Sequence, residues 1–201
     1  LSAAKKVIKE FNDRKQDSQV IICASTHSPE EKILINAFEL LKNEKALLIL
    51  VPRHPERAYK ILKEMKNSNL EVALFSENKF QLDFSKRINL IDEIGYLEDL
   101  FSLADIAFIG GTLIPHGGQN FLEAVRYSLP ISSGNSFYNF QEIAEDLIEM
   151  NILEVGNNAE QLKSIWQRQL TLVSEEISKH TKDYLEQREG ASERTFEYLS
   201  L

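Results

Sequence analysis

The stretch GGTLIPHGGQNFLEA at 110–124 combines two glycine pairs, a histidine, an amide and a carboxylate directly after the apolar run DIAFI. Four glycines in so short a segment indicate a backbone that comes close to another group. Gly117 and Gly118 precede a helix-like pattern, where free N–H groups and the helix dipole favour an anion such as phosphate. For Gly110 and Gly111, relief of crowding at a strand end is the alternative role.

Two polar side chains follow the second glycine pair. Asn120 and Glu123 are three positions apart, which places them on one face of the expected helix. A carboxylate one turn into that helix can accept hydrogen bonds from both hydroxyls of a ribose. The alternative is that Glu123 only complements the helix dipole. The segment therefore predicts a site for a nucleotide, with the phosphate at the glycine pair.

Comparable polar groups follow other apolar runs. Ser25, Thr26 and His27 come after VIICA, Arg53 and His54 come after LLILV, and GNSFYN, with Asn139 at its end, comes after LPISS. A guanidinium held next to a proline at a strand end suits a phosphate or a base edge. The alternatives are a surface ion pair of Arg53 with Glu30 or Glu56, and purely structural roles for the two histidines.

Several other site chemistries are disfavoured. The sequence has neither the G-x-G-x-x-G pattern in a first strand–helix turn nor the G-K-[ST] of a P-loop, and it has no G-x-S-x-G nucleophile elbow. No His, Cys and Asp cluster has metal-ligand spacing, so no metal or other cofactor is expected. The net charge of −8 argues against a nucleic-acid binder. The single cysteine, Cys23, allows no disulfide pair and reads as a small core residue.

The elements that would position these residues alternate between short apolar runs and longer amphipathic ones. Strands are expected at 19–25, 46–51, 71–76, 88–92, 105–110, 129–133 and 152–156. Helices are expected at 29–43, 55–67, 97–104, 119–128, 140–150 and from 157 to the end, with a break near 188–192. This alternation predicts one α/β domain with a doubly wound parallel sheet. Ligands of such sheets bind at the carboxyl ends of the strands, where the strand order reverses.

Two helix starts have the residues of a capping box. Ser28 is the expected N-cap of the helix at 29–43, with Pro29 in the first helical position and Glu31 in the third. Asn139 and Glu142 repeat this pattern at the helix at 140–150. For Asn139 the alternative is a role in the site.

Together these segments resemble one family, the 3-deoxy-D-manno-octulosonate (Kdo) transferases. ASTHSPEE, LILVPRHPER, ADIAFIGGTLIPHGGQNFLEA and SFYNFQEI occur in the order and spacing of that family, over roughly residues 19–147. The resemblance implies the Rossmann-like, carboxyl-terminal, donor-binding half of a GT-B fold. It also implies transfer of Kdo from CMP-Kdo to a lipid A precursor in lipopolysaccharide biosynthesis. By resemblance and position, the CMP-Kdo site would comprise Ser25, Thr26, His27, Arg53, His54, Gly110, Gly111, Gly117, Gly118, Asn120, Glu123 and Asn139.

The resemblance implies that the general base and the acceptor site lie in an amino-terminal domain, which this chain is expected to lack. The chain begins at Leu1 and is expected to be an excised, soluble domain spanning 1–201, with a linker or first helix at 1–18 and carboxyl-terminal helices at 157–201. We expect it to bind the donor without transferring it. The missing half would hold the lipid A precursor and associate with the cytoplasmic face of the bacterial inner membrane.

The chain departs from the family pattern at two positions of its main motif. Gln119 stands where a histidine is frequent, and Ala124 stands where a proline is frequent. An imidazole role at position 119 is lost unless His116 takes it over. The alternatives to a Kdo transferase are a GT-B enzyme that uses a UDP-sugar, and a non-catalytic nucleotide-binding module.

Overall fold

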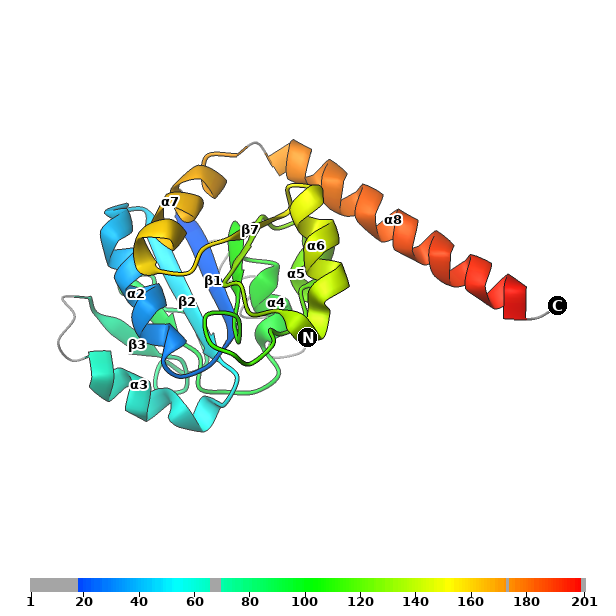
Figure 1. Cartoon of the computed structure of the whole chain (residues 1–201). Helices are drawn as coiled ribbons and strands as arrows, with labels where there is room; N and C mark the ends of the chain where they lie inside the picture. Colours follow the sequence, from blue (N-terminus) through cyan, green and yellow to red (C-terminus); the bar gives the residue numbers. More distant parts are fainter. Residues whose placement is uncertain (1–17, 66–69, 173, 200–201) are drawn as a thin grey trace.

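The computed structural model describes residues 18–65, 70–172 and 174–199 (Figure 1). The strands are β1 (Gln19–Thr26), β2 (Ala46–Pro52), β3 (Val72–Leu74), β4 (Ile88–Leu90), β5 (Ile106–Ile109), β6 (Ile131–Ser133) and β7 (Leu153–Val155). The α-helices are α2 (Glu30–Leu41), α3 (Ala58–Glu64), α4 (Leu97–Phe101), α5 (Leu122–Arg126), α6 (Gln141–Glu149), α7 (Ala159–Gln169) and α8 (Ser174–Leu199). Two 3-10 turns, η1 (Pro55–Arg57) and η3 (Tyr138–Phe140), precede α3 and α6. The expected linker or first helix at 1–18 lies outside the described residues except for Ser18.

The strands form one seven-stranded sheet in the order β3-β4-β2-β1-β5-β6-β7. Every pairing is parallel, and β1 lies between β2 and β5. The chain therefore extends the sheet outward from β1 in one direction and then, from β5 onward, in the other. This confirms the predicted doubly wound α/β fold and places the reversal of strand order between β1 and β5.

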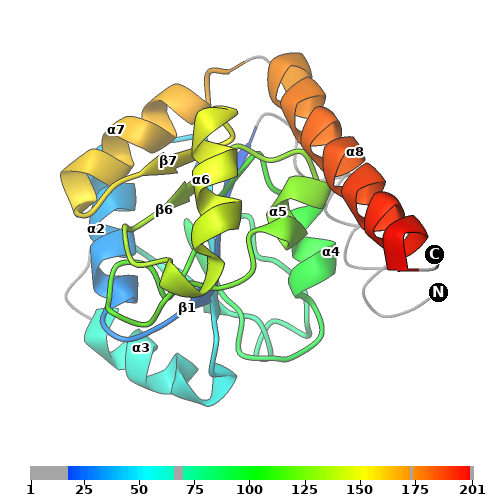
Figure 2. The ribbon, with the colours of Figure 1, turned by 45° about the vertical axis from the view of Figure 1, so that its right-hand side comes forward.

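Two apolar clusters cover the two faces of the sheet. On one face, Ile21 and Cys23 pack with residues of α2, α3 and α7, including Trp166. On the other face, Val20 and Ile22 pack with residues of α4, α5, α6 and the first part of α8. Figures 1 and 2 show these two helical layers on opposite sides of the strands. Because both faces are covered, the central strands are apolar without alternation, as the sequence predicted.

The core role predicted for Cys23 is confirmed, since its side chain is completely buried. Burial raises the pKa of its thiol well above the ordinary value, and the nearby carboxylates of Glu30 and Glu31 raise it further.

Both predicted capping boxes are wrong. Pro29 occupies the N-cap position of α2 and Phe140 that of α6, and neither helix start has a side-chain cap. Ser28 therefore caps nothing. The side chain of Asn139 instead donates to the carbonyl of His116, at 3.3 Å. Glu31, the acidic residue of the first predicted box, instead pairs with Arg57, as described below.

Two helix boundaries also differ from expectation. The helix expected at 119–128 covers only 122–126, because the chain before it is held in a loop by other contacts. The expected break near 188–192 is wrong, since α8 is continuous from Ser174 to Leu199. The change of direction falls earlier, between the end of α7 at Gln169 and the start of α8.

Candidate functional site

The carboxyl ends of β1 and β5 are in direct contact. Ala24 pairs with Ile109, and the next amide, that of Gly110, donates to the carbonyl of Ala24 at 2.8 Å. A Cβ atom on Gly110 would lie only 2.4 Å from the carbonyl oxygen of Ser25. Ser25 itself has a left-handed backbone with φ of 54° at an irregularity of β1. Gly110 is therefore required by the packing of two strand ends, which is the alternative that the sequence left open.

A carboxylate of the protein itself occupies the amide cluster next to this contact. The side chain of Glu30, at the start of α2, is fully buried. Its Oε2 accepts from the amides of His27 and Gly111, each at 2.8 Å. Its Oε1 accepts from those of Thr112 and Leu113, at 3.0 and 2.9 Å. Four charge-assisted hydrogen bonds thus join the loop after β1 to the loop after β5.

The second glycine pair is also engaged within the protein. The amide of Gly118 donates to the carbonyl of Gly111 at 2.8 Å, and that of Gly117 lies 3.4 Å from the hydroxyl oxygen of Ser136. The prediction that both amides are free to meet a ligand is wrong. Both glycines have positive φ, 95° and 85°, and a Cβ on Gly117 would lie 2.3 Å from Nδ2 of Asn139. The sharp reversal of this loop explains the pair.

Asn120 and Glu123 do not share a helix face. Asn120 precedes α5, and its Oδ1 accepts from the amide of Leu122 at 3.0 Å. Glu123 lies in the first turn of α5 and is partly exposed. Both remain at the edge of the sheet that the strand ends define, so a role in ligand binding stays a prediction for each.

Three histidines gather at this edge. The ring centroids of His27 and His116 are 4.1 Å apart, and those of His27 and His54 are 5.9 Å apart. His54 also lies 3.5 Å from the carboxylate of Glu56. The structure thus brings together His27 and His54, as the sequence predicted, and adds His116 to them.

His27 is neutral at physiological pH. Burial, followed by the neighbouring His116, His54 and Arg57, lowers the pKa of His27 to about 4, with Glu31 acting in the opposite direction. Nε2 of Gln119 lies 3.2 Å from Nε2 of His27. With the Gln119 amide in this orientation, its NH₂ group can only donate, so His27 accepts there and carries its proton on Nδ1.

Two arginines follow β2, and they differ in their contacts. Arg53 is exposed, and its guanidinium forms no ion pair or hydrogen bond with any residue that the structure describes. The ion pair with Glu30 or Glu56 that the sequence left open is absent there. Arg57 forms a two-pronged pair with the buried carboxylate of Glu31, at 2.9 and 3.1 Å. Only Arg53 is thus available to an anionic ligand.

Thr26 is directed inward. Its side chain is fully buried, and its hydroxyl donates to Oε1 of Glu31 at 3.1 Å. Its carbonyl accepts from the amide of Arg53 at 2.9 Å, which holds the start of the Arg53 loop against the end of β1. Thr26 therefore positions its neighbours. Ser25 is only partly buried and lies beside it.

Sequence reasoning missed Glu30, Glu31 and Arg57. Glu31 was assigned to a capping box, Glu30 was considered only as an ion-pair partner of Arg53, and Arg57 was placed in a helix. A usable signal was nevertheless present, because two consecutive carboxylates follow a proline immediately after a buried strand, opposite a glycine-rich loop.

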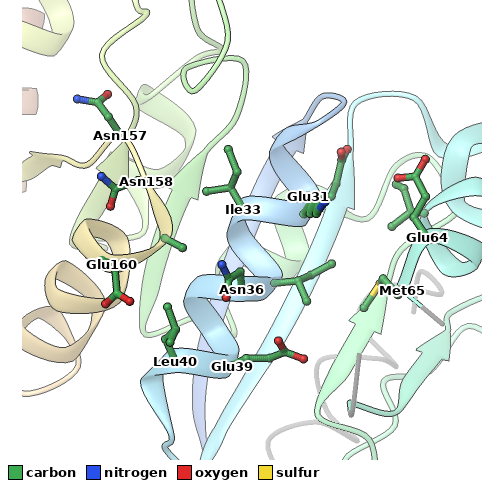
Figure 3. A pocket seen from close by; sticks show the side chains of 14 residues that line it. Glu31, Ile33, Asn36, Glu39, Leu40, Glu64, Met65, Asn157, Asn158 and Glu160 are labelled. Carbon is green, nitrogen blue, oxygen red and sulfur yellow. The ribbon is translucent and has the colours of Figure 1, made fainter. Parts of the chain in front are cut away.

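Three further observations concern metal binding, membrane spans and hollows of the surface. Within 18–65, 70–172 and 174–199, no cluster of three or more His, Cys, Asp or Glu residues could hold a metal ion. No helix in the same ranges is long and apolar enough to cross a membrane. A hollow of about 890 Å³ lies elsewhere, along the outer surface of α2 between α3 and α7, where Ile33, Leu40 and Met65 contribute to its lining (Figure 3).

The sheet order, the covered faces and the polar strand ends define a Rossmann-like domain of the GT-B class. The crystal structure of the C-terminal CMP-Kdo binding domain of WaaA from Acinetobacter baumannii superposes with a TM-score of 0.81. The two sequences are 30% identical, and the superposition covers 90% of this chain and 95% of the WaaA domain. A protein from Anabaena, Alr3699/HepE in complex with UDP and glucose, has the same fold at 14% identity and a TM-score of 0.62, over 99% of this chain and 53% of that one.

Sequence relatives agree with this assignment. The 3-deoxy-D-manno-octulosonic acid transferase of Haemophilus influenzae is 36% identical over 152 residues, which are 74% of this chain and 35% of that protein. No protein-family model matches the chain. The chain belongs to the 3-deoxy-D-manno-octulosonic acid transferase family. It spans about a third of the length of the Haemophilus relative.

Proposed function

We propose that this chain is the CMP-Kdo-binding domain of a Kdo transferase that acts in lipopolysaccharide biosynthesis. The observation that carries the proposal is the match to the CMP-Kdo binding domain of WaaA, 30% identical over 95% of that chain. The candidate site supports it, because the polar residues lie at the reversal of strand order, where α/β sheets bind nucleotides.

The described contacts favour side chains over backbone amides as the groups that hold the donor phosphate. Glu30 already occupies the amides of Gly111, Thr112 and Leu113. Arg53 is exposed just after the end of β2, and Ser25 lies at the end of the neighbouring strand β1. As the bond between sugar and phosphate breaks, charge grows on the leaving CMP. A guanidinium beside the phosphate would stabilise that charge as it develops.

The remaining roles follow from the positions of the side chains. Glu123, on the first turn of α5, would accept the ribose hydroxyls, with Asn120 beside it. We propose that transfer inverts the sugar configuration and uses no metal. The attacking hydroxyl of the lipid A precursor, the general base and the membrane contact would belong to another part of the full-length enzyme. The chain alone would then bind CMP and transfer nothing.

Calorimetric titration with CMP tests the proposal. We expect saturable binding at millimolar ligand or below, weaker binding of UDP, and a loss of about tenfold in CMP affinity for Glu123→Ala, which removes two hydrogen bonds to ribose. Glu160→Ala is the matched control, because Glu160 is an exposed carboxylate in the first turn of α7, next to the hollow beside α2.

Each arm has a defined meaning. If the wild-type chain binds no CMP at millimolar concentration, or if Glu123→Ala binds it as well as the wild type, the assignment fails. Tighter binding of UDP than of CMP would instead favour a GT-B enzyme that uses a UDP-sugar.

A further inference from the structure

The feature that the proposed function does not yet use is the stacked pair of His27 and His116. Their ring centroids are 4.1 Å apart and the ring planes are tilted by 38°. The two residues come from loops that follow different strands, β1 and β5, on the two sides of the reversal point. His116 is exposed, so one side of the pair is open to a ligand.

The backbone of His116 is fixed by the neighbouring loop. Nδ2 of Asn139 donates to its carbonyl at 3.3 Å, and the hydroxyl of Tyr138 donates to the carbonyl of Pro115 at 3.3 Å. The amide of His116 donates to the carbonyl of Ile114 at 2.7 Å. A Cβ on Gly111 would lie 3.1 Å from Cδ2 of His116, so the glycine there leaves room for the ring. The backbone that carries the imidazole is therefore fixed, and the ring itself stacks on His27.

The charges around the pair favour an anion. His54 precedes η1 and Arg57 lies within it, with its guanidinium paired to Glu31. The loop after β5 contributes the amide of Gln119, which contacts His27. The carboxylates nearest to the pair already have partners: that of Glu30 with four amides, and that of Glu31 with Arg57. Glu56 lies against His54. The imidazole of His116 has no hydrogen-bond partner among the described residues, so it is the group of this pair that remains for a ligand.

We propose that His116 is a donor-binding residue, and that with His27 it contacts an anionic oxygen of the nucleotide phosphate. In this chain His116 would supply the imidazole that position 119, a glutamine, lacks. The inference rests on the proposed function, because it names a further contact of the same nucleotide. The sequence had suggested His116 only as a replacement for the histidine that is frequent at position 119.

The test compares CMP with cytidine, which lacks the phosphate, in calorimetric titrations at pH 7. We expect His116→Gln to weaken CMP binding about tenfold, the effect of losing one charge-assisted hydrogen bond, and to leave cytidine binding within about twofold of wild type. His180→Gln is the matched control, since His180 lies on α8 and not at the strand ends. NMR of the histidine rings adds a direct readout: CMP should shift the signals of His27 and His116 and not those of His180.

The outcomes separate this inference from the function on which it rests. Binding of CMP by the wild type with unchanged affinity in His116→Gln would overturn the role of His116 and leave the CMP site standing. An equal loss for CMP and cytidine would also overturn it, because the contact would then not be to the phosphate. Absence of CMP binding in the wild type would remove the proposed function itself.

Discussion

Replacing Glu30 with glutamine should destabilise the domain strongly, although the two side chains have nearly the same shape. The carboxylate accepts four backbone amides, two on each oxygen, at 2.8 to 3.0 Å. A glutamine offers one carbonyl oxygen for two of them. Its NH₂ group then faces the other two donors, and those amides lose their acceptor in a fully buried position.

The magnitude follows from the number of hydrogen bonds. A hydrogen bond to a charged group contributes about 1.5–3 kcal/mol, and a buried donor left without a partner costs about 1–3 kcal/mol, so these are two measures of one loss. Two such losses amount to about 3–6 kcal/mol. That is a large part of the 5–15 kcal/mol of total stability typical of a domain.

Urea denaturation followed by circular dichroism at pH 7 measures the difference. Glu39→Gln is the matched control, because Glu39 is on the same helix, is exposed, and should change the free energy of unfolding by less than about 0.5 kcal/mol. Hydrogen exchange adds a local test: in Glu30→Gln, the amides of Gly111, Thr112 and Leu113 should exchange much faster than in the wild type. A loss below 1 kcal/mol, together with protected amides at these positions, would refute the assignment of Glu30 as the link between the two loops.

Two further predictions concern neighbouring positions. Gly110→Ala should destabilise the domain by about 2–3 kcal/mol in the same urea assay, because its Cβ would lie 2.4 Å from a backbone oxygen of Ser25. A loss of stability below about 1 kcal/mol in Gly110→Ala would contradict the crowding. The pKa of His27 is lowered to about 4, so the unfolded chain binds its proton first as the pH falls. This group therefore lowers the stability as the pH falls from about 6.5 toward 4. His27→Gln should weaken that decline, and an NMR titration in which the His27 ring protonates above pH 6 would contradict the prediction.

Much of the architecture could be predicted from the sequence. The apolar runs that became β1, β2 and β5 are buried on both faces of the sheet, and this burial needs a continuous apolar pattern that is visible without coordinates. The presence of polar residues after these strands was visible for the same reason. Since the carboxyl ends of parallel strands share one edge, His27, Arg53 and the glycine-rich stretch had to approach one another.

The partners of the polar groups were not predictable in this way. Local patterns assigned Ser28 and Asn139 to caps, but the corresponding helices start without side-chain caps. The amides of Gly117 and Gly118 were expected to face a ligand, but that of Gly118 donates to the carbonyl of Gly111 and that of Gly117 lies 3.4 Å from the hydroxyl oxygen of Ser136. The amides after β5 also bond to Glu30, and Glu30 and Gly111 are 81 positions apart, so no local pattern indicates this contact.

The sequence alone determined the fold class, the family resemblance and the edge of the sheet where the candidate site lies, because hydrophobic burial follows from periodic patterns within each segment. Only the tertiary structure decided which polar groups form hydrogen bonds or ion pairs within the protein and which remain for a ligand. A buried donor or acceptor must find a partner, and that partner is chosen by three-dimensional proximity. Glu30 accepts hydrogen bonds from the backbone amides, and Glu31 binds Thr26 and Arg57. Arg53 and His116, which stacks on His27, remain exposed.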